Sequence, residues 1–503
     1  MHTPPKKIRT ALSLGLALAF ASGPVFATND AMMQLLEALH KKGTIDDDTY
    51  QAILLSARAD EEQNAAAGAD VAKKVDQSLA QLGTPALSPG KFEIKDKTGD
   101  FTWRTIGRLQ YDDAFFNNNG KFKSADSNQF RRVRMGVAGT IATNWKFKVE
   151  YDLREIDTGI AGLKDAYIQY IGKLPGIDPI KHPVDIKVGQ SHEPFSFELL
   201  NSSNNSLFTE RALPVNVLAN FIGERNPGLK LTTWGESWTA AAGLFATRQQ
   251  ETTTPVNCTL PTGTAFKAGA KFTCSGGAED TLPRAFNDGY AGTVRGTYAP
   301  WHDGGHVLHL GTSFSYRDFA NNSTVQLRER MEVNETSTRL IDTGAFKADD
   351  FFRWNAEMAV IQGPFTFQGE YLLLKTHAPT KNDPMFTGYY VSAGWFFTGE
   401  SRPYKFQEGT FDSVKPNSIV GKGGIGAWEV VTRYSSADLN DELINGGQEN
   451  NWTVGVNWYP APNIRFMADY VKVLEVKGGQ DNQDRKFANS TPSAFVLRSA
   501  VFW

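Results

Sequence analysis

The segment from Phe130 to Leu153 alternates apolar or small residues with polar ones, and this period of two predicts β-strands. Bulky aliphatic and aromatic side chains occupy one set of positions, including Met135, Trp145 and Tyr151. The intervening positions carry charge, at Arg132, Arg134, Lys146, Lys148, Glu150 and Asp152. Two such strands joined by a tight turn are typical of a membrane barrel, in which the apolar face meets lipid and the polar face lines the interior.

The same alternation recurs from Phe101 to the last residue in about sixteen segments. We expect these strands to begin near Phe101, Phe130, Trp145, Leu163, Val184, Asn226, Trp238, Phe286, His306, Phe351, Pro364, Gly388, Ala427, Asn451, Ile464 and Ala494. Short turns alternate with long polar connections, such as 191–225, 249–285, 318–350 and 438–450. The pattern predicts an all-β fold, a transmembrane antiparallel β-barrel of about 16 strands within residues 91–503.

One connection departs from this arrangement, because residues 398–426 form a long connection on the side of the short turns. The last strand ends in an aromatic residue, Trp503, and resembles the assembly signal of bacterial outer-membrane proteins. Other tryptophans and tyrosines lie near the predicted strand ends, where aromatic girdles of membrane proteins are found.

The first 90 residues have a different character from the predicted barrel. Residues 1–27 combine three basic residues, an apolar run and a small-residue site, which predicts a signal peptide cleaved after Ala27. Residues 28–90 carry apolar positions at helical spacing, followed by Pro89 and Gly90, and predict a helical periplasmic segment with a linker. This segment is either a coiled coil that helps three barrels assemble or a solvated helical hairpin.

Charge and hydropathy narrow the classes of function. The chain has 52 Lys and Arg against 55 Asp and Glu, and removal of residues 1–27 leaves 49 basic residues against 55 acidic ones. This mildly acidic balance gives no reason to expect a nucleic acid partner. No other apolar run is as long as a transmembrane helix, so a membrane-spanning form must be a closed barrel in outer-membrane lipid.

The alternation also predicts which charges face the interior. The first strand sends Arg104 and Arg108 inward, and the second sends Arg132 and Arg134. Later strands contribute Lys146, Lys148, Arg154, Lys187, Arg295, Arg353, Arg433 and Arg498, with the carboxylates Glu150, Asp152, Asp165, Asp185, Glu357, Glu370 and Glu429. A basic surplus favours entry of anions, and guanidinium groups suit phosphate, because their planar fork bonds two oxygens. The alternative is that these charges only solvate a wide channel and pair with one another.

The connection at 191–225 is too long and too apolar for a plain surface loop. We expect it to fold into the lumen, pack its apolar side chains on the wall and narrow the pore. Its polar side would then present charged and amide groups to solutes, among them Asn204, Asn205, Glu210, Arg211 and Arg225.

Several motifs together are similar to the phosphate-selective porin O/P family, and the resemblance covers residues 101–503. They are FRRVRMGVAGT, LKDAYIQY, GQSHEPFSFELLNSSNNSLFTERALP, the GESRPY stretch and GAWEVVTRYS. The resemblance implies a sixteen-stranded, usually trimeric outer-membrane porin with arginines leading to an anion site at the constriction.

In phosphate-specific members of that family, the anion site uses an arginine pair, an aspartate and a lysine from the inward loop. The pair matches Arg131 and Arg132, and the aspartate matches Asp165. The loop lysine has no counterpart here, because the corresponding stretch offers Asn204 or Asn205, with Arg211 following. Strand alternation alone places Arg131 away from the lumen unless the strand begins or bulges there.

The remaining candidate sites are few. Cys258 and Cys274 lie in one long predicted external loop. Because an exported protein passes through oxidising compartments, we expect a disulfide between them. Neither has the paired spacing of a zinc site, so we expect no metal and no cofactor. The leading hypothesis is an outer-membrane porin for passive diffusion of small anions, with phosphate or polyphosphate as candidate solutes. The alternatives are a general non-specific porin, an outer-membrane barrel enzyme and an adhesin or structural anchor.

Overall fold

The computed structural model describes the greater part of the predicted barrel and scattered residues before it. The described residues are 37–43, 45–52, 54–56, 70, 73–74, 86–88, 91–96, 98, 100–154, 162–173, 182–246, 289–303, 305–478 and 487–503. The predicted signal peptide and the two cysteines lie outside them. The chain divides into two compact units, one at the N-terminus and one that holds the barrel. No helix in the described residues is long and apolar enough to cross a membrane.

The N-terminal unit contains helical turns at residues 37–41, 47–52 and 54–56, within the segment predicted to be helical. Two short strands, β1 (Ala86–Ser88) and β2 (Lys91–Lys95), lie in the predicted linker and at the start of the barrel region.

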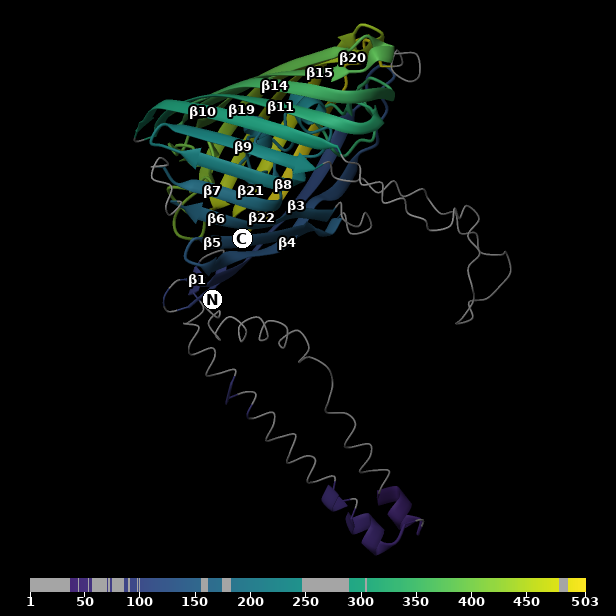
Figure 1. Cartoon of the computed structure of the whole chain (residues 1–503), viewed down its shortest axis with the longest axis vertical. Helices are drawn as coiled ribbons and strands as arrows, with labels where there is room; N and C mark the ends of the chain where they lie inside the picture. Colours follow the sequence, from purple (N-terminus) through teal and green to yellow (C-terminus); the bar gives the residue numbers. More distant parts are fainter. Residues whose placement is uncertain are drawn as a thin grey trace, which may run out of the picture. The chain divides into compact units, whose positions relative to one another are not determined.

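Sixteen antiparallel strands form the barrel, as the alternation predicts (Figure 1). They are β3 (Thr102–Asn117), β4 (Ser127–Ala142), β5 (Trp145–Asp152), β6 (Leu163–Gly172), β7 (Val184–His192), β8 (Arg225–Trp234), β9 (Trp238–Ala246), β10 (Tyr290–Asp303), β11 (His306–Val325), β14 (Phe346–Gln362), β15 (Phe365–His377), β16 (Met385–Phe396), β19 (Ala427–Asp441), β20 (Ile444–Ala461), β21 (Ile464–Lys477) and β22 (Ser493–Phe502). Each pairs with the next, and β22 pairs with β3 in the register Arg498 to Asp112, which closes the barrel. Closure leaves no unpaired sheet edge in the lipid.

The two faces of the strands are as the alternation predicts. On β4 the outward Met135 is 55% exposed, whereas the neighbouring Arg134 is 6% exposed. Large apolar side chains remain exposed around the barrel, among them Trp145, Val149, Phe314, Trp395 and Trp452. An exposed apolar surface of this extent is stable in a lipid environment, because the outward side chains need no protein cover there.

Two connections are shorter than the sequence analysis predicts. The expected loop at 438–450 is a turn at 442–443, because β19 and β20 extend almost to meet each other. These extensions are rich in Asn, Asp and Gly, which resembles loop composition, but their cross-strand pairing overrides that local preference. The expected loop at 318–350 is reduced to 326–345 and contains a small hairpin of β12 (Arg328–Glu329) and β13 (Ile341–Asp342).

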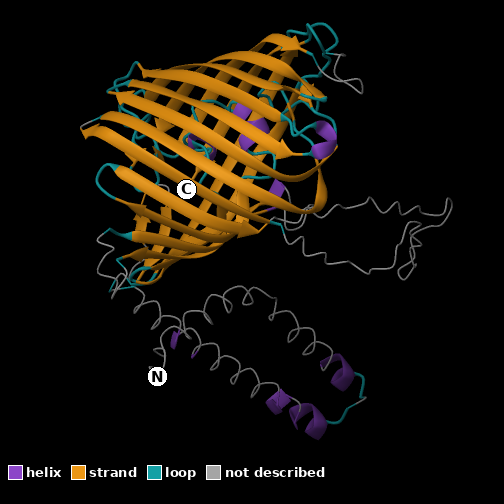
Figure 2. Ribbon diagram, turned by 45° about the horizontal axis from the view of Figure 1, so that its top comes forward, coloured by secondary structure: helices purple, strands orange, loops and turns teal. Residues whose placement is uncertain are grey.

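The connection between β7 and β8 folds into the barrel, as predicted, and we call residues 193–224 the constriction loop. It contains the helical turn α4 (Phe197–Leu200) and the π-helical turn η2 (Val215–Ala219), and Figure 2 shows short helical turns enclosed by the strands. Its apolar residues join one buried cluster with Phe351, Leu372 and Phe386 of the wall.

A wall glycine makes room for this packing. A Cβ atom on Gly388 of β16 would lie 2.6 Å from the Cβ of Pro214 and 2.8 Å from the carbonyl oxygen of Ser436. The constriction loop therefore sits on the wall at a point where only glycine allows so close an approach.

Candidate functional site

A cavity of about 440 Å³ lies between the constriction loop and the wall formed by β3 to β10. Its lining carries eleven Lys and Arg residues against five carboxylates. The basic members are Arg104, Arg108, Arg132, Arg134, Lys148, Lys187, Arg211, Arg225, Lys230, Arg295 and Lys405, and the acidic members are Glu150, Asp165, Asp185, Glu224 and Glu408. The lumen therefore carries a positive surplus at this place, although the whole chain has a formal net charge of -3. Such a surplus attracts small anions.

A β-bulge explains the position of Arg131. Across β3 and β4, Gln110 pairs with Arg132 and Tyr111 pairs with Phe130, so Arg131 has no partner in the register. The extra residue lets Arg131 and Arg132 both face the interior, which strict alternation forbids. Arg131 does not line the cavity; its Nε and Nη2 lie 2.5 Å and 3.1 Å from the two carboxylate oxygens of Glu210 in the constriction loop.

Arg132 bonds an amide and, in the described part of the chain, no carboxylate. Its Nη1 donates to the side-chain oxygen of Gln110 at 2.8 Å, and the described residues give it no ion pair within 4.0 Å. Arg104 also lines the cavity and has no ion pair within 4.0 Å among the described residues. Each of these two guanidinium groups therefore keeps donors that no carboxylate of the described residues occupies.

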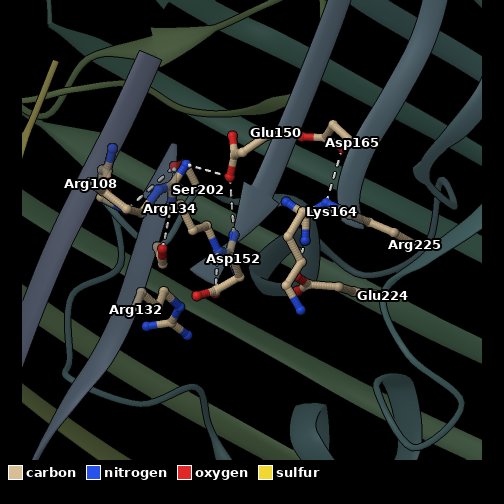
Figure 3. A network of polar contacts seen from close by, with 12 residues as sticks. Arg108, Arg132, Arg134, Glu150, Asp152, Lys164, Asp165, Ser202, Glu224 and Arg225 are labelled. Atoms are coloured by element: carbon tan, nitrogen blue, oxygen red, sulfur yellow. Dashed lines mark hydrogen bonds and ion pairs between the residues drawn. The ribbon is translucent and has the colours of Figure 1, made fainter. Parts of the chain in front are cut away.

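Arg108 and Arg134 share one carboxylate, as Figure 3 shows. Glu150 lies 3.6 Å from Nη2 of Arg108 and 3.4 Å from Nη1 of Arg134, and Asp152 holds Nε of Arg134 at 2.9 Å. Arg108 also donates to the hydroxyl of Ser203 at 2.7 Å. The two carboxylates orient the two arginines in the wall and balance their formal charge, so the basic surplus of the lining comes from the other cations of the cavity.

Asp165 lies in the cavity, where it is held by two cations. Its Oδ2 accepts from Nζ of Lys148 at 2.6 Å, and its Oδ1 accepts from Nε of Arg225 at 3.0 Å. Arg225 begins β8, directly after the constriction loop, so this pair joins the end of the loop to β6 (Figure 3). Both oxygens are occupied, and we assign Asp165 to positioning Lys148 and Arg225.

The constriction loop brings hydroxyl and amide groups to the cavity. Ser202, Ser203 and Asn204 line it, and Arg211 follows at the far side of the loop. Arg211 donates to the carbonyl oxygen of Leu199 and lies 2.7 Å from a carboxylate oxygen of Glu224. Burial lowers the pKa of Arg211 to about 10, so it remains charged at neutral pH.

Seven of the eight predicted anion ligands therefore meet at one cavity, and Arg131 binds the constriction loop beside it. The sequence analysis did not select Lys230 or Lys405 for this site. Lys230 lies on the inward side of β8 at 229–231, where alternation could have found it. Lys405 belongs to the connection between β16 and β19, residues 397–426, which the sequence analysis gives as 398–426. No local pattern predicts that this connection enters the lumen.

Other inward arginines are buried and paired with carboxylates. Arg295, which also lines the cavity, lies 2.6 Å from Glu357, and outside the cavity Arg433 lies 2.7 Å from Glu332 and Arg498 lies 2.5 Å from Asp112. The alternative, in which inward charges pair with one another, thus describes these three arginines.

Comparison with known proteins agrees with this architecture. Residues 104–501 match the family described as phosphate-selective porin O and P. Porin O of Pseudomonas aeruginosa is 28% identical over 432 residues, which cover 78% of this chain and 88% of that protein. A protein of Caulobacter vibrioides is 26% identical over 83% of this chain and 79% of its own length.

Solved structures of lower sequence identity were also found. An anion-selective porin from Comamonas acidovorans aligns over 80% of this chain and 100% of its own, with 12% identity and a TM-score of 0.45. The match along residues 104–501 covers more than half of the sequence and includes the barrel and its constriction loop. The chain therefore belongs to the phosphate-selective porin O and P family and is an anion porin of the bacterial outer membrane.

Proposed function

We propose that the channel passes small inorganic anions by diffusion, with phosphate among its solutes, and that it acts as a homotrimer in outer-membrane lipid without catalytic activity. The observation that carries this proposal is the cavity with eleven basic and five acidic side chains, in which Arg104 and Arg132 have no carboxylate within 4.0 Å in the described part of the chain. Planar guanidinium groups can each bond two oxygens of a tetrahedral oxyanion.

The alternative is a general porin in which the basic surplus attracts any anion. One observation favours it, since Asn204 or Asn205 stands where phosphate-specific members of the family carry a loop lysine. Arg211 and Arg225 supply positive charge near that place, so the loss of one ammonium does not remove the surplus. The proposal is therefore an anion channel with phosphate affinity set mainly by wall arginines.

Current through single channels in a planar bilayer tests the proposal. We expect chloride to pass in preference to potassium, and we expect phosphate to block the chloride current. Arg132→Ala should raise the half-blocking phosphate concentration by about fivefold, as expected for the loss of one unit charge near 4 Å in water. Arg328→Ala is the matched control, because Arg328 is exposed on β12, outside the cavity.

A preference for potassium over chloride in the unmodified channel would rule out the anion assignment. An unchanged phosphate block in Arg132→Ala would remove that residue from the site. The trimer is tested by the mass of the detergent-extracted protein before heating, where a monomer alone would contradict it.

A further inference from the structure

The connection at 397–426 enters the lumen from the side of the short turns. It contains a small hairpin of β17 (Tyr404–Lys405) and β18 (Thr410–Phe411). The carbonyl oxygen of Phe406 accepts from the hydroxyl of Thr239 at 2.6 Å, which fixes the hairpin to β9. On its other side, the backbone N–H of Phe411 donates to the side chain of Asn201 at 2.8 Å, so the hairpin also meets the constriction loop.

The wall holds the tip of this hairpin by its backbone. Arg295 donates through Nη1 to the carbonyl oxygen of Glu408 at 2.9 Å and through Nη2 to that of Gly409 at 2.8 Å. Gly409 has φ of 59°, and a Cβ atom there would lie 3.0 Å from Oγ1 of Thr297. With both carbonyls bound to the wall, the tip has one fixed position.

The side chain of Glu408 is left facing the cavity. Glu408 is exposed and lines the same space as Lys148, Lys187, Lys230 and Lys405. The described residues give its carboxylate no ion pair within 4.0 Å, so it acts on these lysines through water. Enclosure inside the barrel would by itself raise the pKa of Glu408, but the nearby lysines lower this pKa below its ordinary value. A permanent negative charge therefore stands in the basic cavity.

We propose that Glu408 is a specificity-determining residue, a tethered carboxylate that competes with solute anions for the lysines at the short-turn end of the cavity. Lys230 is the lysine for which Glu408 and a solute anion compete most directly. Among the described residues, its Nζ donates only to the carbonyl oxygen of His192, at 3.1 Å, and has no carboxylate within 4.0 Å. A channel must bind its solute weakly enough to release it, and a fixed carboxylate lowers anion affinity at that end. This inference rests on the proposed anion channel.

Reversal potentials in a KCl gradient measure the effect of the Glu408 charge on ion selectivity. The salt is kept at about 0.1 M, because higher concentrations would screen this charge. Glu408→Gln should raise the ratio of chloride to potassium permeability by about threefold, the size expected for a unit charge acting over roughly 7 Å of water. The half-blocking phosphate concentration should fall by about the same factor. The variant should fold, because the wall contacts of residue 408 use only its backbone.

Glu236→Gln is the matched control. Glu236 lies exposed in the short turn between β8 and β9 and does not line the cavity, so the same loss of charge there should leave both measurements unchanged. The inference is overturned if Glu408→Gln keeps the permeability ratio of an anion-selective parent channel, or if Glu236→Gln changes it equally. Potassium selectivity of the parent channel would instead overturn the proposed function, so the two failures are distinguishable.

Discussion

Glu332 fixes the constriction loop to the wall, and its removal should loosen the pore. Glu332 lies within the external connection 326–345 and has a left-handed backbone conformation, with φ of 60°. Its Oε1 accepts from the backbone N–H of Leu213 at 2.7 Å and from the hydroxyl of Ser435 at 2.5 Å. Its Oε2 accepts from Arg433 at 2.7 Å and from Thr453 at 3.1 Å. One buried carboxylate thus joins three segments of the chain.

Glu332→Gln removes the charge and keeps the volume. The buried Arg433 then faces an amide instead of a carboxylate, and breaking a buried pair in this way costs about 3 to 5 kcal/mol. Glu198 lies 3.7 Å from Arg433 and offsets part of that loss, so we expect the lower end of the range. The constriction loop itself loses the charge on the acceptor of the Leu213 N–H. If about 1.5 kcal/mol of the loss falls on that hydrogen bond, the undocked population of the loop rises roughly tenfold. Arg211, two residues before Leu213, would lose its fixed position in the cavity.

Single-channel recording is the assay for this change. We expect larger conductance, more frequent flicker in the open state and a weaker phosphate block. Glu329→Gln is the control, because Glu329 pairs with Arg339 at 3.1 Å within the same external connection and does not bind the constriction loop. If the Glu332→Gln protein folds into the barrel and its conductance and current noise equal those of the parent channel, Glu332 does not hold the constriction loop in place.

Two further predictions follow from the loops. Gly388→Ala should lower the heat-denaturation midpoint, at a cost of about 1 to 3 kcal/mol, because the added methyl group meets Pro214, whereas the control Gly296→Ala has no atom within 4 Å of its Cβ. An unchanged midpoint would contradict this contact. Burial and the charge of Asp112 raise the pKa of Glu335 to about 7, so the carboxylate is charged above that pH and neutral below it. The chloride preference should rise as pH falls from about 8 to 6, and Glu335→Gln should lose this change in a pH series of reversal potentials.

Much of the barrel follows from the sequence alone, because each strand is specified by its own alternation. In the fourteen residues of β10, for example, lipid-facing and lumen-facing positions alternate, and this alternation alone fixes which side chains point inward. The predicted starts of β5, β6, β7, β9, β11, β19 and β21 are the observed ones. The inward arginines Arg104, Arg108 and Arg134 were predicted for the same reason.

Other features were decided by contacts between distant segments. Local pattern does not reveal which inward arginines are neutralised: Arg498 meets Asp112 across the barrel closure, whereas Arg132 has no carboxylate partner within 4.0 Å among the described residues. The bulge at Arg131 also appears only when β3 and β4 are paired, because a bulge is a property of two strands.

The alternating stretch from Phe130 to Leu153 therefore determined the membrane barrel and the sides of its walls. The tertiary structure decided where the positive charge remains available, because the constriction loop and the 397–426 connection reach that space from positions far away in the chain. Charge in a pore depends on which partners fold back to meet it, and alternation along one strand does not specify those partners.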